Sequence, residues 1–354
     1  MSSIPLDMDK FVASAMAEYM GDKESKPEPD TPAPAPAPTV AKKVVLKEGE
    51  SMFSDVFGNV PKNIPDFAVA KFMDVPAELS AFIPKVDTDY VVQVEEAAAI
   101  TSAIVDGDKV LISGPTGSGK SSLVKYVCAK LGAPFIRINM SADAESSTLF
   151  GQLVARDGST VWEDGPITEA VRHGGVVLID EWELMPPEIS MGLQNLLEDD
   201  GYLYLKERPG SSEDKTIMPH KNFRIICAGN TVGQGDDSGA FSGTSVQNSA
   251  TLDRFTTTVH LGYLDTKHEI NVIRNRSKVS RDVANNMVKF AHLVRNAYNN
   301  GAINLTMSPR TLINWAQKID KHGDVKAAFN LAFMAKLRES DKKVVSDVYT
   351  KVFG

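Results

Sequence analysis

The chain has 354 residues, of which 42% are hydrophobic, so it is long enough for two or three domains with sizeable buried cores. Its 38 Lys and Arg residues against 46 Asp and Glu residues give a net charge of −8 without a basic cluster, which argues against a nucleic-acid partner. Because there is neither an apolar run of 18 residues nor a secretory signal, and Cys128 and Cys227 are isolated, we expect a cytoplasmic protein with no membrane span, disulfide or thiolate metal site.

Residues 1–42 combine a short amphipathic helix with a proline-rich linker. Apolar residues between positions 5 and 20 recur at helical spacing and form one stripe. The alternating prolines that follow cannot sustain a helix or a sheet, so residues 21–41 are expected to be extended, with a reach of roughly 60 Å. We expect the helix to dock on a partner or a neighbouring subunit; alternatively, it packs on its own domain or stays disordered.

The rest of the chain divides by pattern into three parts. Residues 43–85, with apolar clusters between Gly and Pro residues, predict a small ordered segment. Residues 86–264 alternate between strands expected at 109–113, 135–139, 176–179 and 223–228 and helices expected at 92–105, 121–131, 167–173 and 189–197. This alternation predicts an α/β fold whose parallel sheet is sandwiched by helices. Residues 265–354 are helical in pattern, with breaks at Gly301 and Gly323, and predict a small C-terminal helical domain.

A glycine-rich motif at residues 114–121 is the strongest functional signal. It fits GxxxxGK[ST] and lies between an expected strand and an expected helix, which is the context that this motif requires. The residues expected to bind ATP are Gly114, Pro115, Thr116, Gly117, Ser118, Gly119, Lys120, Ser121 and Ser122. Lys120 should reach the β- and γ-phosphates, and Ser121 should hold Mg²⁺. The alternative is a glycine-rich turn with a solvated lysine.

Two acids follow the expected strand at residues 176–179. In a parallel sheet, ligands bind at the carboxyl ends of the strands, where Asp180 and Glu181 would lie. Asp180 is expected to support Mg²⁺, and Glu181 to polarise the attacking water as a general base. Adjacent acids also occur by chance at such turns, but their position sixty residues after Lys120 favours the functional interpretation.

Three further polar residues complete the candidate catalytic set. Asn230, at the tip of the strand expected at 223–228, could orient the attacking water, or it could cap the next turn. Arg254, just after an expected helix, could act in a neighbour's active site, although an exposed arginine more often forms a local ion pair. Arg310 follows Ser308 and Pro309 at the start of a helix and could fold over the γ-phosphate.

Two segments of the expected α/β domain predict hairpins. Residues 152–164 alternate in polarity and contain Asp-Gly, a turn signal, and residues 202–220 form a second candidate just before the Asn230 strand. Surface loops without a role are the alternative in both places.

These motifs together resemble the AAA+ ATPases of the MoxR group, and most of all the CobS-type ATPase subunit of aerobic cobaltochelatase. The resemblance covers roughly residues 45–320. The segments that carry it are FIPKVDTDYVV (82–92), GPTGSGKSS (114–122), GGVVLIDEWELMPPE (174–188) and GNTVGQGDDSGAFSGTSVQNSATLDRF (229–255). The proline-rich linker and its helix depart from the family's pattern, and the segment after Glu181 lies between the MoxR and CobS patterns.

The resemblance implies an oligomeric ring, usually a hexamer, with ATP sites between neighbours. It implies that Arg254 is the finger acting in trans, Asn230 the first sensor and Arg310 the second. It also implies a von Willebrand A-type (CobT-like) partner, with which the chelatase ATPase drives cobalt insertion into a corrin ring. In this family the hairpin at residues 152–164 faces the pore or the partner. A GTPase of the restriction-complex (McrB-like) kind and a nucleotide-gated scaffold are the alternatives.

Overall fold

The computed structural model describes residues 46–58, 60–73, 75–231 and 249–354. The predictions for the N-terminal helix and linker, and for most of residues 229–255, lie outside these ranges. The chain divides into two compact units, Val44–Gly262, here called the core, and Tyr263–Gly354, here called the lid. Within the described ranges, no helix has the length and apolar character needed to span a bilayer.

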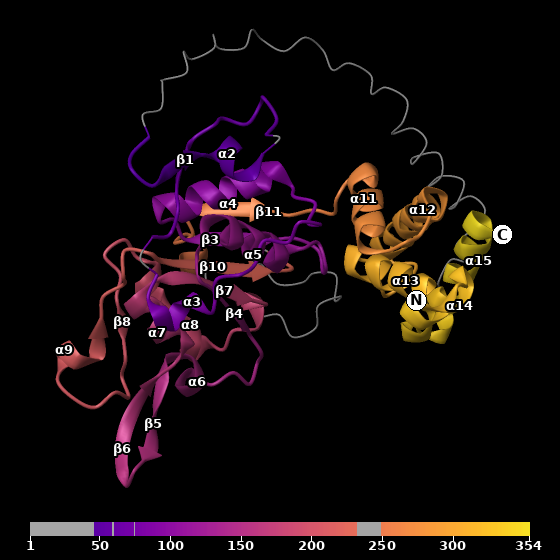
Figure 1. The fold of residues 1–354 in the computed structure, drawn as a ribbon. Coiled ribbons are helices and arrows are strands. Elements are labelled where there is room, and N and C mark those ends of the chain that lie inside the picture. Colours follow the sequence, from indigo (N-terminus) through magenta and orange to yellow (C-terminus); the bar gives the residue numbers. More distant parts are fainter. Residues whose placement is uncertain (1–45, 59, 74, 232–248) are drawn as a thin grey trace. The chain divides into compact units, whose positions relative to one another are not determined.

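A five-stranded parallel sheet forms the centre of the core (Figure 1). In spatial order its strands are β11 (Thr257–His260), β3 (Val110–Ser113), β10 (Phe223–Gly229), β7 (Gly175–Asp180) and β4 (Phe135–Asn139). The register pairs Gly229 with Ser113 and Ala228 with Asp180, so β3, β10 and β7 end side by side. The α/β class predicted from the sequence is confirmed, whereas the edge strand β11 was missed.

Helices cover both faces of this sheet (Figure 1). One face carries α4 (Val94–Asp106) and α5 (Lys120–Leu131), and the other carries α7 (Pro166–His173) and α8 (Pro187–Gln194). Successive strand side chains point to opposite faces, so Leu111 and Ile112 belong to two different hydrophobic clusters. Burial on both faces explains why the strands appear in the sequence as continuous apolar runs.

A small two-stranded sheet precedes the main sheet along the chain. It forms with two short helices, in the order β1 (Glu50–Met52), α2 (Phe53–Phe57), β2 (Ala68–Ala70) and α3 (Ala77–Ser80). The ring of Phe53 is fully buried and stacks on Phe57 and Phe67 at centroid distances of 4.4 and 5.0 Å. Because these rings share a hydrophobic cluster with α4 and α5, this segment packs as part of the core.

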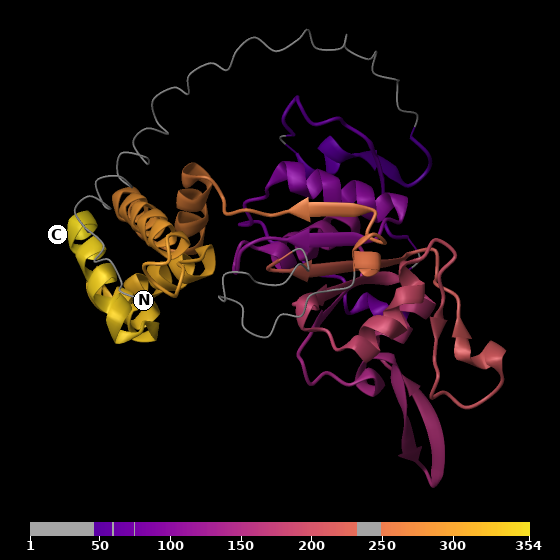
Figure 2. The ribbon, with the colours of Figure 1, turned by 180° about the vertical axis from the view of Figure 1, so that it is seen from behind.

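Two hairpins extend the core, and both were expected from the sequence. After α6 (Ser146–Phe150), strands β5 (Gly151–Arg156) and β6 (Ser159–Asp164) pair antiparallel and reach away from the sheet in both views (Figures 1 and 2). Their turn residues, Asp157 and Gly158, both have positive φ, as a two-residue hairpin turn requires. The second hairpin joins β8 (Leu203–Tyr204) to β9 (Thr216–Ile217) through α9 (Ser212–Lys215).

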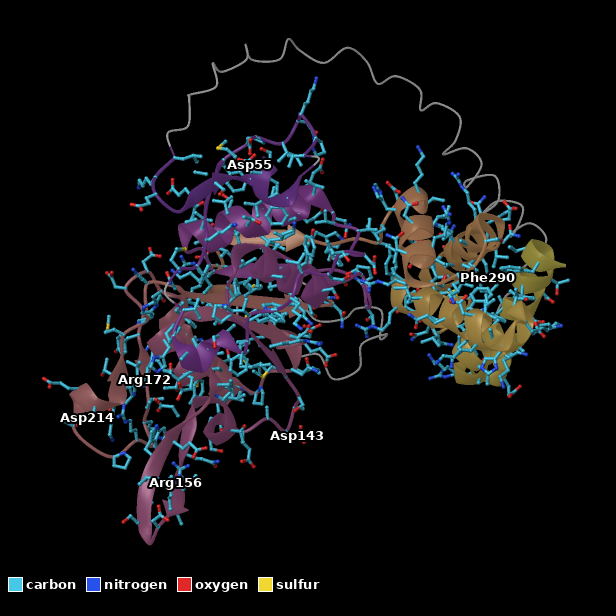
Figure 3. The ribbon with its side chains drawn as sticks, in the orientation of Figure 1. Asp55, Asp143, Arg156, Arg172, Asp214 and Phe290 are labelled. Carbon is cyan, nitrogen blue, oxygen red and sulfur yellow. The ribbon has the colours of Figure 1, made fainter. Side chains whose placement is uncertain are left out.

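The lid is helical and has its own aromatic core. Its helices are α11 (Thr266–Arg276), α12 (Arg281–Asn299), α13 (Pro309–His322), α14 (Val325–Ala332) and α15 (Glu339–Phe353), with the 3-10 turn η3 (Met334–Lys336) before the last. Phe290, labelled among these helices in Figure 3, meets Trp315 and Phe329 edge to face at 5.8 and 5.1 Å. The Ser308 hydroxyl accepts the Thr311 N–H at the start of α13, so the cap expected there is present.

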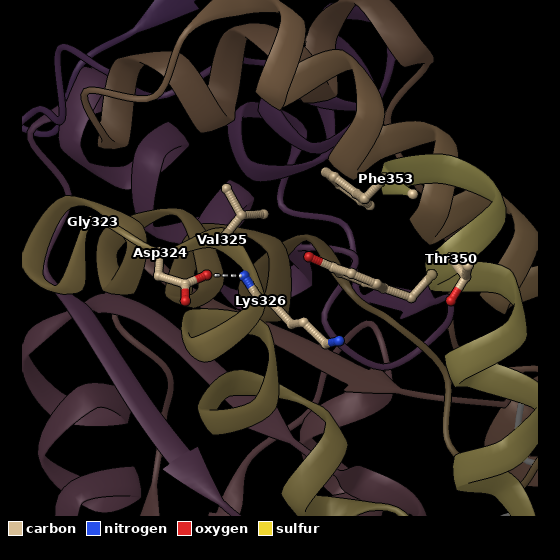
Figure 4. Close-up of a pocket in the computed structure, with 8 residues that line it drawn as sticks. Gly323, Asp324, Val325, Lys326, Thr350 and Phe353 are labelled. Carbon is tan, nitrogen blue, oxygen red and sulfur yellow. Dashed lines mark hydrogen bonds between the residues drawn. The ribbon is translucent and has the colours of Figure 1, made fainter.

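A pocket of about 570 Å³ lies at the end of α15 in the lid (Figure 4). Its residues include Asp324, Lys326 and Tyr349. The Asp324 carboxylate accepts the N–H groups of Lys326 and Ala327 at 2.7 and 3.2 Å, and thereby caps α14. This carboxylate is therefore engaged in holding the helix.

Candidate active site

The phosphate loop connects β3 to α5, and its backbone conformation explains its glycines. Gly114, Gly117 and Gly119 have φ values of 151°, 75° and 103°, which side-chain-bearing residues rarely adopt. A Cβ atom on Gly114 would also overlap the carbonyl oxygen of Leu261. Because α5 begins directly at Lys120, the loop lies at the positive end of a twelve-residue helix, where an anion is stabilised.

Lys120 and Asn230 meet at the carboxyl edge of the sheet. The Lys120 side chain is 8% exposed, and its Nζ donates to the carbonyl of Gly114 at 2.6 Å and to Asn230 Oδ1 at 3.1 Å. The hydroxyl of Thr116 donates to the same Asn230 oxygen at 3.3 Å. Asn230 follows β10, the strand between β3 and β7, which places it beside the loop. The site therefore gathers a cation and amide and hydroxyl groups that can bind phosphate.

Ser121 and Asp180 form an oxygen pair beside the loop. The Ser121 hydroxyl donates to Asp180 Oδ2 at 2.5 Å, and the Asp180 side chain is almost completely buried. Among the described residues, no three His, Cys, Asp or Glu side chains gather as a metal site. A hydroxyl and a single carboxylate fit Mg²⁺, which keeps several waters and takes other ligands from the phosphates. The residues present are thus suited to Mg²⁺ bound together with a nucleotide.

Arg137 was not included in the site predicted from the sequence. From β4, its Nε donates to Asp180 Oδ2 at 2.9 Å, and its Nη2 lies 2.7 Å from the same oxygen. A metal ion at Asp180 would have to share or displace this contact. The alternation of β4 indicates only that the Arg137 side chain faces away from Ile136 and Ile138, which lie in the hydrophobic cluster. Its partner follows from the pairing of β4 with β7.

Glu181 stands in a left-handed backbone conformation, with φ of 56° and ψ of 40°. Its side chain is exposed, and its N–H donates to Asp180 Oδ1 at 3.2 Å. Non-glycine residues in this conformation are uncommon and cluster at functional sites, where the surrounding structure holds them. The conformation turns the chain sharply after β7 into the 3-10 turn η1 (Trp182–Leu184).

Glu183, within η1, is a second residue that the sequence reasoning missed. It is 1% exposed, and its Oε1 accepts the main-chain N–H of Asn230 at 2.7 Å. Burial raises the pKa of this carboxyl, while the Asn230 hydrogen bond and the charge of Lys120 act in the opposite direction. The available signal was the position of this acid between the apolar residues Trp182 and Leu184.

The two predicted arginines belong to different units of the chain, Arg254 to the core and Arg310 to the lid. Arg254 follows α10 (Ser249–Leu252), and its Nε donates to Glu198 Oε1 at 2.5 Å and its Nη1 to the Ala250 carbonyl at 2.8 Å. Arg310 is exposed on the first turn of α13 in the lid. Arg254 therefore bonds to Glu198 and to the end of α10, and not to Lys120, Asp180 or Asn230 of its own core.

Comparisons with known proteins agree with this geometry. The AAA domain (dynein-related subfamily) matches residues 109–255, and the CbbQ/NirQ/NorQ C-terminal domain matches residues 269–350. The chain is 32% identical over 311 residues to the aerobic cobaltochelatase subunit CobS of Sinorhizobium sp., which covers 82% of this chain and 92% of that protein. It is 27% identical to Protein NorQ of Paracoccus denitrificans over 206 residues, covering 58% of this chain and 72% of that one.

Solved structures add a likeness in fold. The Thermotoga maritima RuvB Holliday junction branch migration motor matches 76% of this chain and 72% of its own, with 16% identity and a TM-score of 0.42. At this level of similarity the class of the core is decided by its own parallel sheet and by the matched AAA domain.

Proposed function

Since the chain belongs to the MoxR-type AAA+ ATPases, the family of CobS and NorQ, we propose that it is the ATP-hydrolysing subunit of a ring that energises a partner complex. The resemblance derived from the sequence is thereby confirmed, and the protein is an ATPase. The observation that carries the proposal is the convergence of Asp180 and Asn230 on the phosphate loop at one edge of the sheet.

The phosphates of ATP would bind at the N-terminus of α5. Lys120 Nζ now donates to the Gly114 carbonyl and to the Asn230 amide, both neutral acceptors. The β- and γ-phosphate oxygens carry full charges and make stronger hydrogen bonds with an ammonium group, so they would replace at least one of these contacts. The exchange would free the Asn230 amide to hold the attacking water.

Ser121 and Asp180 would hold Mg²⁺, which neutralises phosphate charge when bound. Glu181 would accept the proton of the attacking water as general base. Its exposed side chain follows Asp180 directly. Because the Glu181 backbone is left-handed, the chain leaves the direction of β7 at this residue. Arg310 is proposed as the second sensor, which would contact the γ-phosphate.

Arg254 would complete the active site of a neighbouring subunit in the ring. Lys120 and Mg²⁺ neutralise only part of the charge that spreads over the γ-phosphate in the transition state. The Arg254 guanidinium is part-exposed and held by Glu198 on its own subunit, so its position at the surface is already fixed. A neighbour's phosphate would compete with Glu198 for this group.

The client is proposed by analogy with the CobS relative. A cobaltochelatase-type complex would pair the ring with a von Willebrand A-type subunit and a large corrin-binding subunit. The match over 92% of CobS supports this assignment, since it includes the C-terminal helical domain as well as the ATPase core.

Subunit mixing tests the ring and its arginine finger. We expect the Lys120→Ala variant to lose ATP binding or turnover, and Arg254→Ala to bind ATP while turnover falls by about 10³-fold. In a mixture, Lys120→Ala subunits supply intact Arg254 to the intact phosphate loops of Arg254→Ala subunits, so activity should return in part. Turnover of ATP and of GTP is measured before and after mixing.

A second mixture is the matched control. Lys120→Ala and Glu181→Gln both disable the subunit's own site, so mixing them should restore nothing. The trans arrangement is wrong if the first mixture stays inactive although both variants assemble, or if an isolated wild-type monomer is fully active. A preference for GTP would favour the McrB-like alternative, and nucleotide binding without turnover would favour the scaffold.

A further inference from the structure

A buried carboxylate lies directly beneath the end of β10. Glu183 Oε1 accepts the Asn230 N–H at 2.7 Å; Glu183 is buried, and Asn230 is half-buried. A Cβ atom on Gly229 would overlap Glu183 Oε2 and press on the ring of Trp182. The glycine thus lets the carboxylate approach the main chain closely enough to bind the next residue.

The contact continues through Asn230 into the phosphate loop. The main chain of Asn230 is held by Glu183, and its side-chain oxygen accepts Lys120 Nζ and the Thr116 hydroxyl at 3.1 and 3.3 Å. A shift of the Asn230 backbone would therefore move the amide that meets these two groups. Hydrogen bonds to an ionised acceptor are about twice as strong as neutral ones, so a carboxylate is an effective anchor.

The other end of the contact lies on the turn that begins at Glu181. The Leu184 N–H donates to the Glu181 carbonyl at 2.9 Å, so Glu183 belongs to the same tight turn as the proposed general base. Glu181 starts this turn in its left-handed conformation. One short segment thereby carries the base at its exposed start and the anchor of Asn230 at its buried centre.

We propose that Glu183 is a positioning residue that fixes Asn230 relative to Glu181, so that the first sensor and the general base hold the attacking water as one unit. This inference rests on the proposed roles of Asn230 and Glu181. Glu183 does not contact the nucleotide in this scheme. Its removal should slow the chemical step and leave nucleotide affinity nearly unchanged, whereas a residue needed only for folding would not separate the two.

The test compares two replacements of similar size. Glu183→Leu removes the acceptor and leaves the Asn230 N–H without this partner, and kcat should fall on the order of tenfold. The KM for ATP should change by less than about twofold, because binding energy lost only in the transition state appears in kcat. Glu183→Gln retains a carbonyl acceptor and should recover most of the turnover.

A double variant separates positioning from independent effects. Once Asn230→Ala has removed the side-chain amide, adding Glu183→Leu should reduce kcat little further, because Glu183 acts on the chemical step by positioning that amide. The inference would be overturned if the kcat reductions of Asn230→Ala and Glu183→Leu multiplied in the double variant. A Glu183→Gln variant as slow as Glu183→Leu would overturn it too. Normal turnover in Asn230→Ala would instead remove the proposed role of Asn230 itself.

Hydrogen exchange provides a check that needs no variant to fold. The Asn230 amide of the wild-type protein should exchange slowly, with protection close to that of the neighbouring β10 amides. Fast exchange at Asn230 next to protected β10 amides would show that the Glu183 contact does not hold in solution, and would overturn the inference.

Discussion

The core and the lid each bury a glutamate, and they satisfy it in different ways. Glu183 in the core and Glu269 in the lid are both 1% exposed. Glu183 accepts a main-chain N–H, whereas Glu269 accepts two hydrogen bonds from the guanidinium of Arg295, at 3.0 and 2.7 Å. The core thus uses its buried carboxyl to hold a residue of the candidate active site, while the lid neutralises its charge with an opposite one.

The lid's ion pair also joins separate parts of that unit. Arg295 donates through Nε to the Met307 carbonyl at 2.7 Å, just before α13, and its guanidinium lies 4.1 Å from the centroid of the Tyr263 ring. Tyr263 is the first residue of the lid, and Glu269 lies on α11. The pair therefore fixes the beginning of the unit against the start of the helix that carries Arg310.

The largest effect should come from the core. Glu181→Gln is expected to bind ATP and lower turnover by about 10²–10⁴-fold, because the proposed general base is lost while Ser121 and Asp180 remain. The measurement is single-turnover hydrolysis together with nucleotide binding. Glu339→Gln, an exposed acid on α15, is the matched control in the lid and should leave both unchanged. Loss of binding together with turnover would mean that Glu181 supports the metal or the fold.

The lid should respond through stability rather than chemistry. Arg295→Met leaves Glu269 buried without its cation, which should lower the free energy of unfolding by about 3–5 kcal/mol. Denaturant unfolding of the variant and of the wild-type protein measures this. Adding Glu269→Leu should restore much of the loss. Equal destabilisation by the double variant would contradict this account of the pair.

The smallest effect concerns pH. Burial raises the pKa of Asp341 in the lid, but hydrogen bonds from Asn304 and Ser340 outweigh it and leave this pKa below its usual value. Asp341 therefore stabilises the lid above the unfolded-state pKa of about 3.9, and this contribution is lost as pH falls through the folded value. The raised pKa of Glu183 has the opposite effect on stability: its contribution is present at low pH and is lost as pH rises.

Comparison of wild type with Asp341→Asn checks this sign. The variant should melt at a lower temperature than wild type at pH 7, and the difference should shrink as pH approaches 3. Thermal unfolding followed across this range is the measurement. A difference that stays constant with pH would show that the charge of Asp341 contributes nothing.

Elements fixed by local pattern could be predicted from the sequence. The phosphate loop, the two acids at the end of β7 and the Ser308 cap each combine a short motif with a periodic neighbour, so their surroundings follow from a few residues. The β5–β6 hairpin was likewise predicted from alternation and the Asp-Gly turn signal. The α/β class follows from repeated alternation of strands and helices.

Features that depend on distant partners could not be predicted. Strand β11 contains three polar residues among four and becomes a strand by pairing with β3, about 147 positions earlier. The contact between Glu183 and Asn230 spans 47 positions, and the strand order that makes it possible has no local signature. The pairing of Arg137 with Asp180 requires β4 to lie beside β7, which is again a property of the assembled sheet.

Trp182 lies against Gly229, so its fluorescence can report on the end of β10. The three tryptophans of the chain fall in three different places. Trp162 is on the β5–β6 hairpin, Trp182 lies beneath the strand that leads to Asn230, and Trp315 is in the lid's aromatic core. Variants that retain one tryptophan at a time would let intrinsic fluorescence follow the hairpin, the region beneath the end of β10 and the lid separately, without an attached dye.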